Sequence, residues 1–169
     1  HAAHGITTIY VTHDQEEAMA LSDRIAVLHA GRLQQCDRPE RVYADPDNLL
    51  AAMAIGSPPL NVLDPRQAPA LAALLPGGSA ATMPVLIGVR PADVLVGAPD
   101  VGSGLTLDAV VSMVEPTGAE TWVIGEVGNQ RIKGRAAPGT SPVPGAPARF
   151  SVVAGRVLLF DSESGTRVR

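Results

Sequence analysis

His13 is the residue whose position best suits chemistry. It follows an apolar, β-branched run from Ile6 to Thr12, and it precedes Asp14 and Glu17, which have the spacing of a helix capping box. In α/β folds, the ends of buried strands and the free N–H groups of a following helix form the edge where anionic ligands bind. A neutral imidazole there can donate one hydrogen bond to a phosphate oxygen. Taken alone, a single histidine at a turn is more often structural, so both interpretations stay open.

The elements that would position His13 lie within residues 1–56. The spacing of apolar residues predicts a buried strand over 6–12, a helix over 15–21 with Ala18, Met19 and Leu21 facing inward, a second buried strand over 24–29, a hairpin strand over 32–36, and two short helices that end at Ala44 and near Gly56. A second capping box, Asp37 with Glu40, is expected to begin the helix that ends at Ala44.

Pro58 and Pro59 mark the expected boundary between a first part, 1–56, and a second part, 57–169. Beyond them, short β runs separated by Pro and Gly predict a small antiparallel barrel. We expect strands over 85–89, 105–113, 121–127, 130–135, 149–153 and 157–160, a short helix over 69–75, a hairpin turn at Gly128-Asn129 and an exposed loop over 136–147. The predicted fold class is α+β: part of an α/β domain followed by a mainly antiparallel β-barrel domain.

Composition restricts the function. The net charge of −4 and the 3% of aromatic residues argue against a nucleic-acid-binding surface, which needs clustered cations and stacking rings. Cys36 is the only cysteine, which excludes an internal disulfide and fits a reducing compartment. Neither a signal-peptide pattern nor a run of about 18 apolar residues is present, and no metal-ligand set is predicted.

The string from Thr8 to Gln35, TIYVTHDQEEAMALSDRIAVLHAGRLQQ, resembles the switch-histidine segment of ABC-type ATPases. That family has a strand ending in T-H-D, then Q-x-E-A, D-R-I-x-V-L and a G-R-x-x-Q hairpin. The resemblance implies that His13 is a catalytic residue that contacts the γ-phosphate of ATP and helps to position the attacking water. It also implies ATP and magnesium as cofactors of the intact protein, with neither expected on this chain alone.

Later motifs resemble the carbohydrate branch of these importers, the maltose and glycerol-phosphate type, including its regulatory TOBE (OB-like) domain. They are Pro39 to Tyr43 with Pro46, I-G-S-P at 55–58 with Leu60-Asn61, G-V-R-P at 88–91, and V-E-P at 114–116 with Gly118 and Glu120-Thr121. The sequence departs from the family at Leu60, where Met is usual, and at Ala92, where Glu is common. About one β-hairpin is shortened between Asn61 and Gly88, so the usual pair of barrels is expected to be reduced to one, or one plus a remnant.

The resemblance implies partners and a location. A homodimer of ATPase subunits, transmembrane permease subunits and a regulatory protein on the C-terminal domain are expected, with no nucleic acid, in the cytoplasm on the inner face of the cell membrane. The chain lacks G-x-x-x-x-G-K-S/T and L-S-G-G-Q, and its only lysine, Lys133, lies outside any such loop. We therefore expect the chain alone to be inactive and the missing motifs to lie upstream of His1.

Three alternatives remain open. The chain could serve an importer of another solute (polyamine, iron or molybdate), or it could be a stand-alone OB-fold module that binds a small ligand. Thirdly, the first fifty or so residues, lacking sheet neighbours, could dimerise, swap or cover their apolar faces against the barrel. The remaining candidates are interpreted as structural: Glu17 as a cap, Glu16 as a solvated charge, His29 as surface, Cys36 as inert, Trp122 as core or barrel face, Arg90 as holding its turn, and Leu158 to Asp161 as an edge strand of the barrel.

Overall fold

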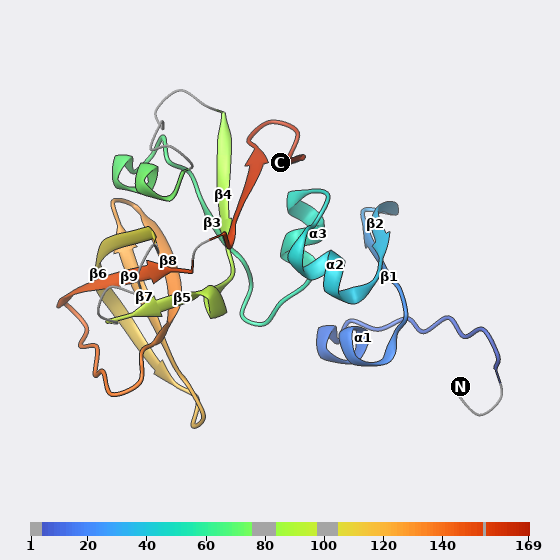
Figure 1. Ribbon diagram of the computed structural model, residues 1–169, viewed down its shortest axis with the longest axis horizontal. Coiled ribbons are helices and arrows are strands. Elements are labelled where there is room, and N and C mark those ends of the chain that lie inside the picture. Colours follow the sequence, from blue (N-terminus) through green and yellow to red (C-terminus); the bar gives the residue numbers. More distant parts are fainter. Residues whose placement is uncertain (1–4, 76–83, 98–104, 154) are drawn as a thin grey trace.

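The computed structural model describes residues 5–75, 84–97, 105–153 and 155–169, which form a helical part, a four-stranded sheet and a β-barrel (Figure 1). The helical part contains α1 (Gln15–Leu21), the hairpin of β1 (Ile25–His29) and β2 (Arg32–Asp37), α2 (Pro39–Ala44) and α3 (Leu49–Ala54). The predicted class, α+β with an OB-like barrel, is confirmed.

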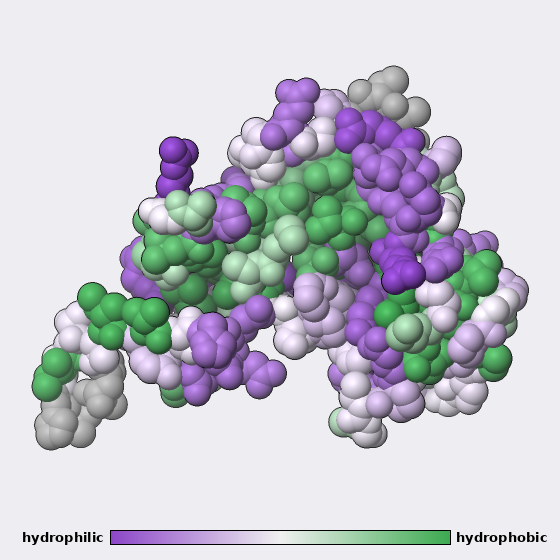
Figure 2. Space-filling view, turned by 180° about the vertical axis from the view of Figure 1, so that it is seen from behind, coloured by the Kyte–Doolittle hydropathy of each residue, from purple (hydrophilic) through white to green (hydrophobic). Residues whose placement is uncertain are grey.

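The predicted strand over 6–12 is wrong. This segment is irregular and exposed, with Ile9 at 89% and Val11 at 91% of full exposure. A strand needs hydrogen-bonding partners along at least one edge, and none of the strands in the described ranges pairs with this segment. Figure 2 shows the resulting apolar atoms on the N-terminal segment, standing away from the body of the molecule.

Helix α1 has the predicted bounds, but half of its capping box is missing. Asp14 Oδ1 accepts from the backbone N–H groups of Glu16 and Glu17 at 2.9 and 3.0 Å, as expected of an N-cap. The Glu17 carboxylate does not return to the Asp14 N–H, which donates instead to Thr12 Oγ1. Leu21, expected to face inward, is 75% exposed.

Helix α2 begins without the second predicted capping box. Its N-cap residue is Arg38, whose side chain forms no cap hydrogen bond, and Pro39 opens the helix. Asp37 instead accepts from the Arg38 N–H at 2.9 Å and pairs with Arg41 at 3.0 Å. The small core beneath the hairpin is apolar and consists of Ile25, Val27, Val42 and Ile55, with Ala18, Met19, Tyr43 and Ala54 packed against it.

A separate four-stranded sheet was not predicted. Its order is β11 (Arg167–Val168), β10 (Val157–Asp161), β4 (Val85–Val89) and β3 (Asn61–Leu63), with antiparallel neighbours. The prediction that Leu158 to Asp161 form an edge strand of the barrel is therefore wrong. This strand belongs to the four-stranded sheet and is paired there on both sides. The periodicity of a short apolar run cannot show which sheet takes it.

Helix α3 packs on that sheet. Ala52 of α3 forms a buried cluster with Leu158 and Phe160 of β10 and with Leu60, which precedes β3. This cluster includes residues on both sides of the boundary expected at 56/57. The division into 1–56 and 57–169 stays a prediction.

The barrel is closed in the order β5 (Val94–Val96), β8 (Gln130–Ala136), β7 (Thr121–Val127), β6 (Leu105–Pro116) and β9 (Pro147–Val152). Its pairs are antiparallel except β5 with β8. Leu107, Ala109 and Val111 point into the core as their alternation predicted, whereas Met113 is 50% exposed because the register shifts between Val111 and Met113. The 3₁₀ helix η1 (Pro69–Leu74) contributes Leu71 and Leu74 to the same core.

No helix in the described ranges is long and apolar enough to cross a membrane.

Candidate functional site

His13 lies in the turn that leads into α1, and its side chain is exposed. Asp14 caps the helix directly after it, so the imidazole stands beside the first turn of α1. Within the described part of the chain, no hydrogen bond or ion pair engages the His13 ring. The ring is thus neither packed in a core nor used to hold the fold, and it is accessible to a ligand.

The segment before His13 is tied to α1 by polar contacts. Tyr10 Oη donates to Glu17 Oε2 at 2.9 Å, and Thr12 Oγ1 donates to the same oxygen at 3.2 Å. The hydrogen bond to Glu17 raises the pKa of Tyr10 above its usual value. Glu17 therefore acts as an acceptor for the approaching segment rather than as the second half of a capping box, and its contacts fix how the chain reaches His13.

Gln15, the first residue of α1, connects the helix to a distant part of the chain. Its Oε1 accepts a hydrogen bond from the backbone N–H of Gly56 at 2.7 Å, across a separation of 41 residues. Gly56 follows the end of α3 and has a φ of +117°, a conformation that favours glycine. The end of α3 and the start of α1 are thereby held together next to His13.

Arg90 is buried, with 3% of its surface exposed, between the helical part and the sheet. Its Nη1 donates to the carbonyl oxygens of Ala52, at 2.8 Å, and Ile55, and its Nη2 donates to that of Tyr43 at 2.9 Å. The guanidinium also lies 4.3 Å from the centre of the Tyr43 ring. Burial lowers the pKa of Arg90, while Tyr43 and Asp93 oppose that shift. The expected role, holding its own turn, is too local, because the side chain binds the ends of α2 and α3.

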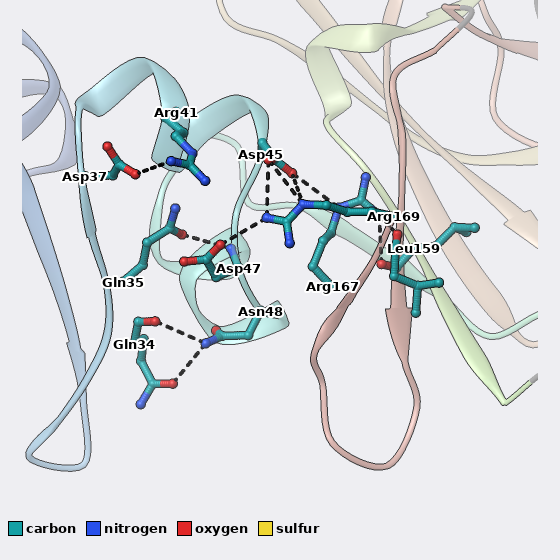
Figure 3. A network of polar contacts seen from close by, with 11 residues as sticks. Gln34, Gln35, Asp37, Arg41, Asp45, Asp47, Asn48, Leu159, Arg167 and Arg169 are labelled. Carbon is teal, nitrogen blue, oxygen red and sulfur yellow. Dashed lines mark hydrogen bonds and ion pairs between the residues drawn. The ribbon is translucent and has the colours of Figure 1, made fainter.

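The C-terminal strand is joined to the loop between α2 and α3 (Figure 3). Arg169 pairs with Asp45 at 3.2 Å and Asp47 at 3.0 Å. The backbone N–H of Arg167 donates to Asp47 O at 3.0 Å. The Arg167 side chain is largely buried, and its guanidinium donates to Leu159 O at 2.9 Å. This end of the chain therefore fastens the sheet to the helical part at a second place.

The same loop is held from its other side by β2. Gln35 Oε1 accepts from the Asp47 N–H at 3.0 Å, and the Asn48 side chain donates to Gln34 Oε1 at 3.2 Å (Figure 3). The loop is therefore a polar junction between the hairpin and the C-terminal strand. Gln34 and Gln35 of β2 lie within the G-R-x-x-Q motif, whose spacing alone gave no sign of this contact.

The lesser candidates lie apart from His13. His29 is exposed at the end of β1 and Cys36 is exposed on β2, 3.9 Å from Arg24 Nη2. Trp122 is buried in β7, as expected for barrel core or face. In the described ranges no group of three or more His, Cys, Asp or Glu side chains could hold a metal ion.

No protein-family model matches the chain. Among curated proteins, it is 39% identical over 179 residues to the sn-glycerol-3-phosphate import ATP-binding protein UgpC of Rhodopseudomonas palustris (strain BisB5), an alignment that covers 96% of this chain and 48% of the relative. It is 35% identical over 172 residues to the protein of that name from Jannaschia sp. (strain CCS1), covering 97% of this chain and 47% of the relative. It is 34% identical over 175 residues to the sulfoquinovosyl glycerol transport ATP-binding protein SmoE of Agrobacterium fabrum (strain C58 / ATCC 33970), covering 96% and 48%.

Over almost its whole length, the chain is therefore similar to ATP-binding subunits of importers, the family that its motifs predicted. The names of these relatives are of the glycerol-phosphate and sugar type, so the resemblance to the carbohydrate branch is confirmed. The chain spans about half the length of the curated relatives it matches. Among solved structures, a chain of the cytoplasmic molybdate-binding protein ModG is 23% identical with a TM-score of 0.40, and covers 54% of this chain and 68% of that one, which is too slight a likeness to bear on function.

Proposed function

We propose that this chain is part of the ATP-hydrolysing subunit of a bacterial ABC importer for glycerol-phosphate or sugar-like solutes. The observation that carries the proposal is the 39% identity to a glycerol-3-phosphate import ATP-binding protein over 96% of the chain. The T-H-D-Q motif at 12–15 and the exposed position of His13 support it.

His13 is the residue proposed to sense the γ-phosphate of ATP. Its ring is exposed beside the first turn of α1, and a neutral imidazole can donate one hydrogen bond to a phosphate oxygen. Bound ATP with magnesium would supply the phosphoryl group for transfer to water. The part of this chain is to orient one phosphate oxygen and the attacking water.

The rest of the nucleotide site is proposed to lie elsewhere in the subunit. The only lysine of the chain, Lys133, is on barrel strand β8 and pairs with Glu115 at 2.5 Å, so it is not free to hold phosphates. A phosphate loop requires a lysine that follows a glycine-rich turn. Alone, the chain is therefore expected to show no ATP hydrolysis.

The exposed apolar residues of the helical part support this division. Ile9 and Val11 before α1, with Leu28 and Leu33 on the β1–β2 hairpin, are 60% exposed or more. Several exposed apolar side chains on one part of a molecule indicate a surface that binds another protein segment. We propose that the remainder of the subunit covers them and supplies the sheet partners that the segment over 6–12 lacks.

The proposed partners follow from the family. The subunit would form a homodimer and bind transmembrane permease subunits at the inner face of the cell membrane, in the cytoplasm. The barrel side would contribute to the dimer contact and receive a regulatory protein.

The test is steady-state ATP hydrolysis by the intact subunit with its permeases, comparing His13→Ala with His29→Ala. His29 is a matched control because it is also exposed and lies at the end of β1. We expect His13→Ala to lower kcat at least about 100-fold with ATP binding retained, since an acid–base or positioning group contributes that much, and His29→Ala to hydrolyse ATP normally. Normal hydrolysis by His13→Ala would refute the assigned role. Uptake of labelled glycerol-3-phosphate and of a sugar by the same complex would identify the solute class.

A further inference from the structure

One peptide group, the unit between Ile55 and Gly56, is held from both sides by side chains from distant parts of the chain. Its N–H donates to Gln15 Oε1 at 2.7 Å. Its carbonyl oxygen, that of Ile55, accepts from Arg90 Nη1. Gln15 begins α1 two residues after His13, and Arg90 lies between β4 and β5. A single peptide therefore connects the His13 end of the molecule to the barrel side.

The Arg90 end of this connection is rigid. The guanidinium also donates to Ala52 O at 2.8 Å and to Tyr43 O at 2.9 Å, and only 3% of the surface of Arg90 is exposed. These carbonyls lie at the C-terminal ends of α2 and α3, where a cation is favoured by the helix dipole. A planar fork that binds acceptors in two directions cannot shift without breaking one of the hydrogen bonds.

Gly56 lies close against the Arg90 side chain. A Cβ atom on Gly56 would lie 2.9 Å from Arg90 Nη1, and the φ of +117° already disfavours any other residue. Because Arg90 Nη1 also donates to the Ile55 carbonyl oxygen, a displacement of this peptide toward Arg90 would displace the guanidinium, and one away from it would break that hydrogen bond.

Movement of Arg90 would pass directly to the barrel. The backbone N–H of Asp93 donates to Arg90 O at 2.9 Å, and Asp93 O accepts from the Val153 N–H at 3.0 Å. The short turn η3 (Pro91–Asp93) then leads into β5, whose Val94 and Val96 are fully buried in the barrel core. Only the three residues of η3 separate Arg90 from β5.

We propose that Gln15 and Arg90 are positioning residues that couple the nucleotide response at His13 to the barrel through the Ile55–Gly56 peptide. This inference rests on the proposed function of His13. Because coupling between two sites is reciprocal in binding free energy, a partner on the barrel would in turn change nucleotide affinity at the His13 end. The coupling runs through the Ile55–Gly56 peptide and its two hydrogen bonds, to Gln15 and to Arg90.

The test compares Gln15→Met with Gln15→Glu in the intact subunit. Met has a similar size but no acceptor for the Gly56 N–H, whereas the Glu carboxylate keeps one. Glu16→Ala is the matched control, since Glu16 is the exposed neighbour on the same helix. The readouts are kcat and KM for ATP, and hydrogen exchange of residues 85–96 with and without a non-hydrolysable ATP analogue and magnesium. Thermal unfolding shows whether each variant is folded.

We expect the analogue to slow exchange over 85–96 in the wild type, in Gln15→Glu and in Glu16→Ala. In Gln15→Met, the slowing of exchange by the analogue should be smaller, and kcat should be lower. Both effects should fall by roughly two- to thirty-fold, the range of measured coupling effects, while KM stays nearly unchanged. A wild-type response in Gln15→Met, an equal loss in Gln15→Glu, or no nucleotide effect over 85–96 in the wild type would each overturn the coupling.

The two proposals fail in distinguishable ways. Loss of hydrolysis in His13→Ala with a normal response in Gln15→Met removes the coupling and leaves the role of His13 standing. Normal hydrolysis in His13→Ala removes both. Should Gln15→Met unfold, Gly56→Ala gives a second test, because a Cβ there would lie 2.9 Å from Arg90 Nη1 and none of its three nearest atoms belongs to Gln15. A smaller nucleotide effect over 85–96 in Gly56→Ala would support the coupling, and a wild-type effect would overturn it.

Discussion

The side chain of Asn61 pairs with the backbone of Lys133 as a neighbouring strand would. Asn61 Nδ2 donates to Lys133 O, and Asn61 Oδ1 accepts from the Lys133 N–H, both at 2.8 Å and across 72 residues. Asn61 begins β3 of the four-stranded sheet, and Lys133 lies on β8 of the barrel. The Asn61 amide therefore bridges the sheet and the barrel in the manner of a strand pair.

We expect Asn61→Ala to lower the free energy of unfolding by about 1–3 kcal/mol, because two backbone groups of Lys133 would lose their partner. Asn129→Ala is the control, since its only side-chain hydrogen bond within the described ranges is a long one of 3.4 Å to Gln67. Urea unfolding of the chain followed by circular dichroism measures both. Equal midpoints for the two variants would show that the Asn61 pair adds no stability.

Gly125 allows the aromatic ring of Phe150 to lie against the barrel wall. A Cβ atom on Gly125 would lie 2.5 Å from Phe150 Cζ and 2.7 Å from Cε2, inside contact distance. We expect Gly125→Ala to cost about 1–3 kcal/mol, as overpacking does. Thermal unfolding should show that Phe150→Leu partly relieves the effect of Gly125→Ala, so that the double variant is more stable than the sum of the two changes implies. Strict additivity would contradict the contact.

Arg167 and Arg169 both reach the loop between α2 and α3, but they should matter unequally. The Arg167 side chain is 12% exposed and donates to Leu159 O and Val168 O, whereas the Arg169 side chain is 54% exposed in ion pairs that salt screens. We expect Arg167→Met to be clearly the more destabilising change in urea unfolding, by about 1–3 kcal/mol, since its two acceptors lose a buried donor. The effect of Arg169→Met should shrink as salt is added. The opposite order would contradict the structure.

Asp64 should make the fold sensitive to acid. Hydrogen bonds from the Arg66 side chain at 2.9 Å hold the pKa of Asp64 below its usual value of 3.8, against the opposing effect of burial. A carboxyl whose pKa is lower in the folded state stabilises the fold above its ordinary pKa, and this stabilisation is lost as the pH falls through the folded value. We expect Asp64→Asn to be less stable than the wild type near neutral pH, with the difference shrinking below about pH 4, as urea midpoints at several pH values would show. A constant difference would rule out this ionisation as its source.

Local patterns predicted most of the elements. The bounds of α1, β4 and β7 followed from a cap, a β-branched run and the Gly128-Asn129 turn, all of which are local signals. The segment over 6–12 has the residues of a strand, but strand formation depends on partners that the described ranges do not supply. The same limit hid the second sheet, since the pairing of β10 with β4 joins residues far apart in sequence.

Within the candidate site, the motif predicted the place of His13, and its exposure agrees with a role in binding. The contacts of Gln15 and Arg90 were missed, because their partners are the Gly56 N–H and the Ile55 carbonyl oxygen, and backbone groups carry no sequence signal of their own. The glycine itself was the only visible hint. It was interpreted as a helix terminator, which agrees with its place after α3 but does not reveal what approaches it.

The role of His13 is tested by ATP hydrolysis in a chimera in which this chain replaces the matching segment of the Rhodopseudomonas palustris relative. With 39% identity across the exchanged part, the chain should complete the nucleotide site. We expect the chimera to hydrolyse ATP and His13→Ala within it to reduce kcat at least about 100-fold. A folded chimera that binds ATP but hydrolyses it equally with and without His13 would show that this histidine has no part in hydrolysis.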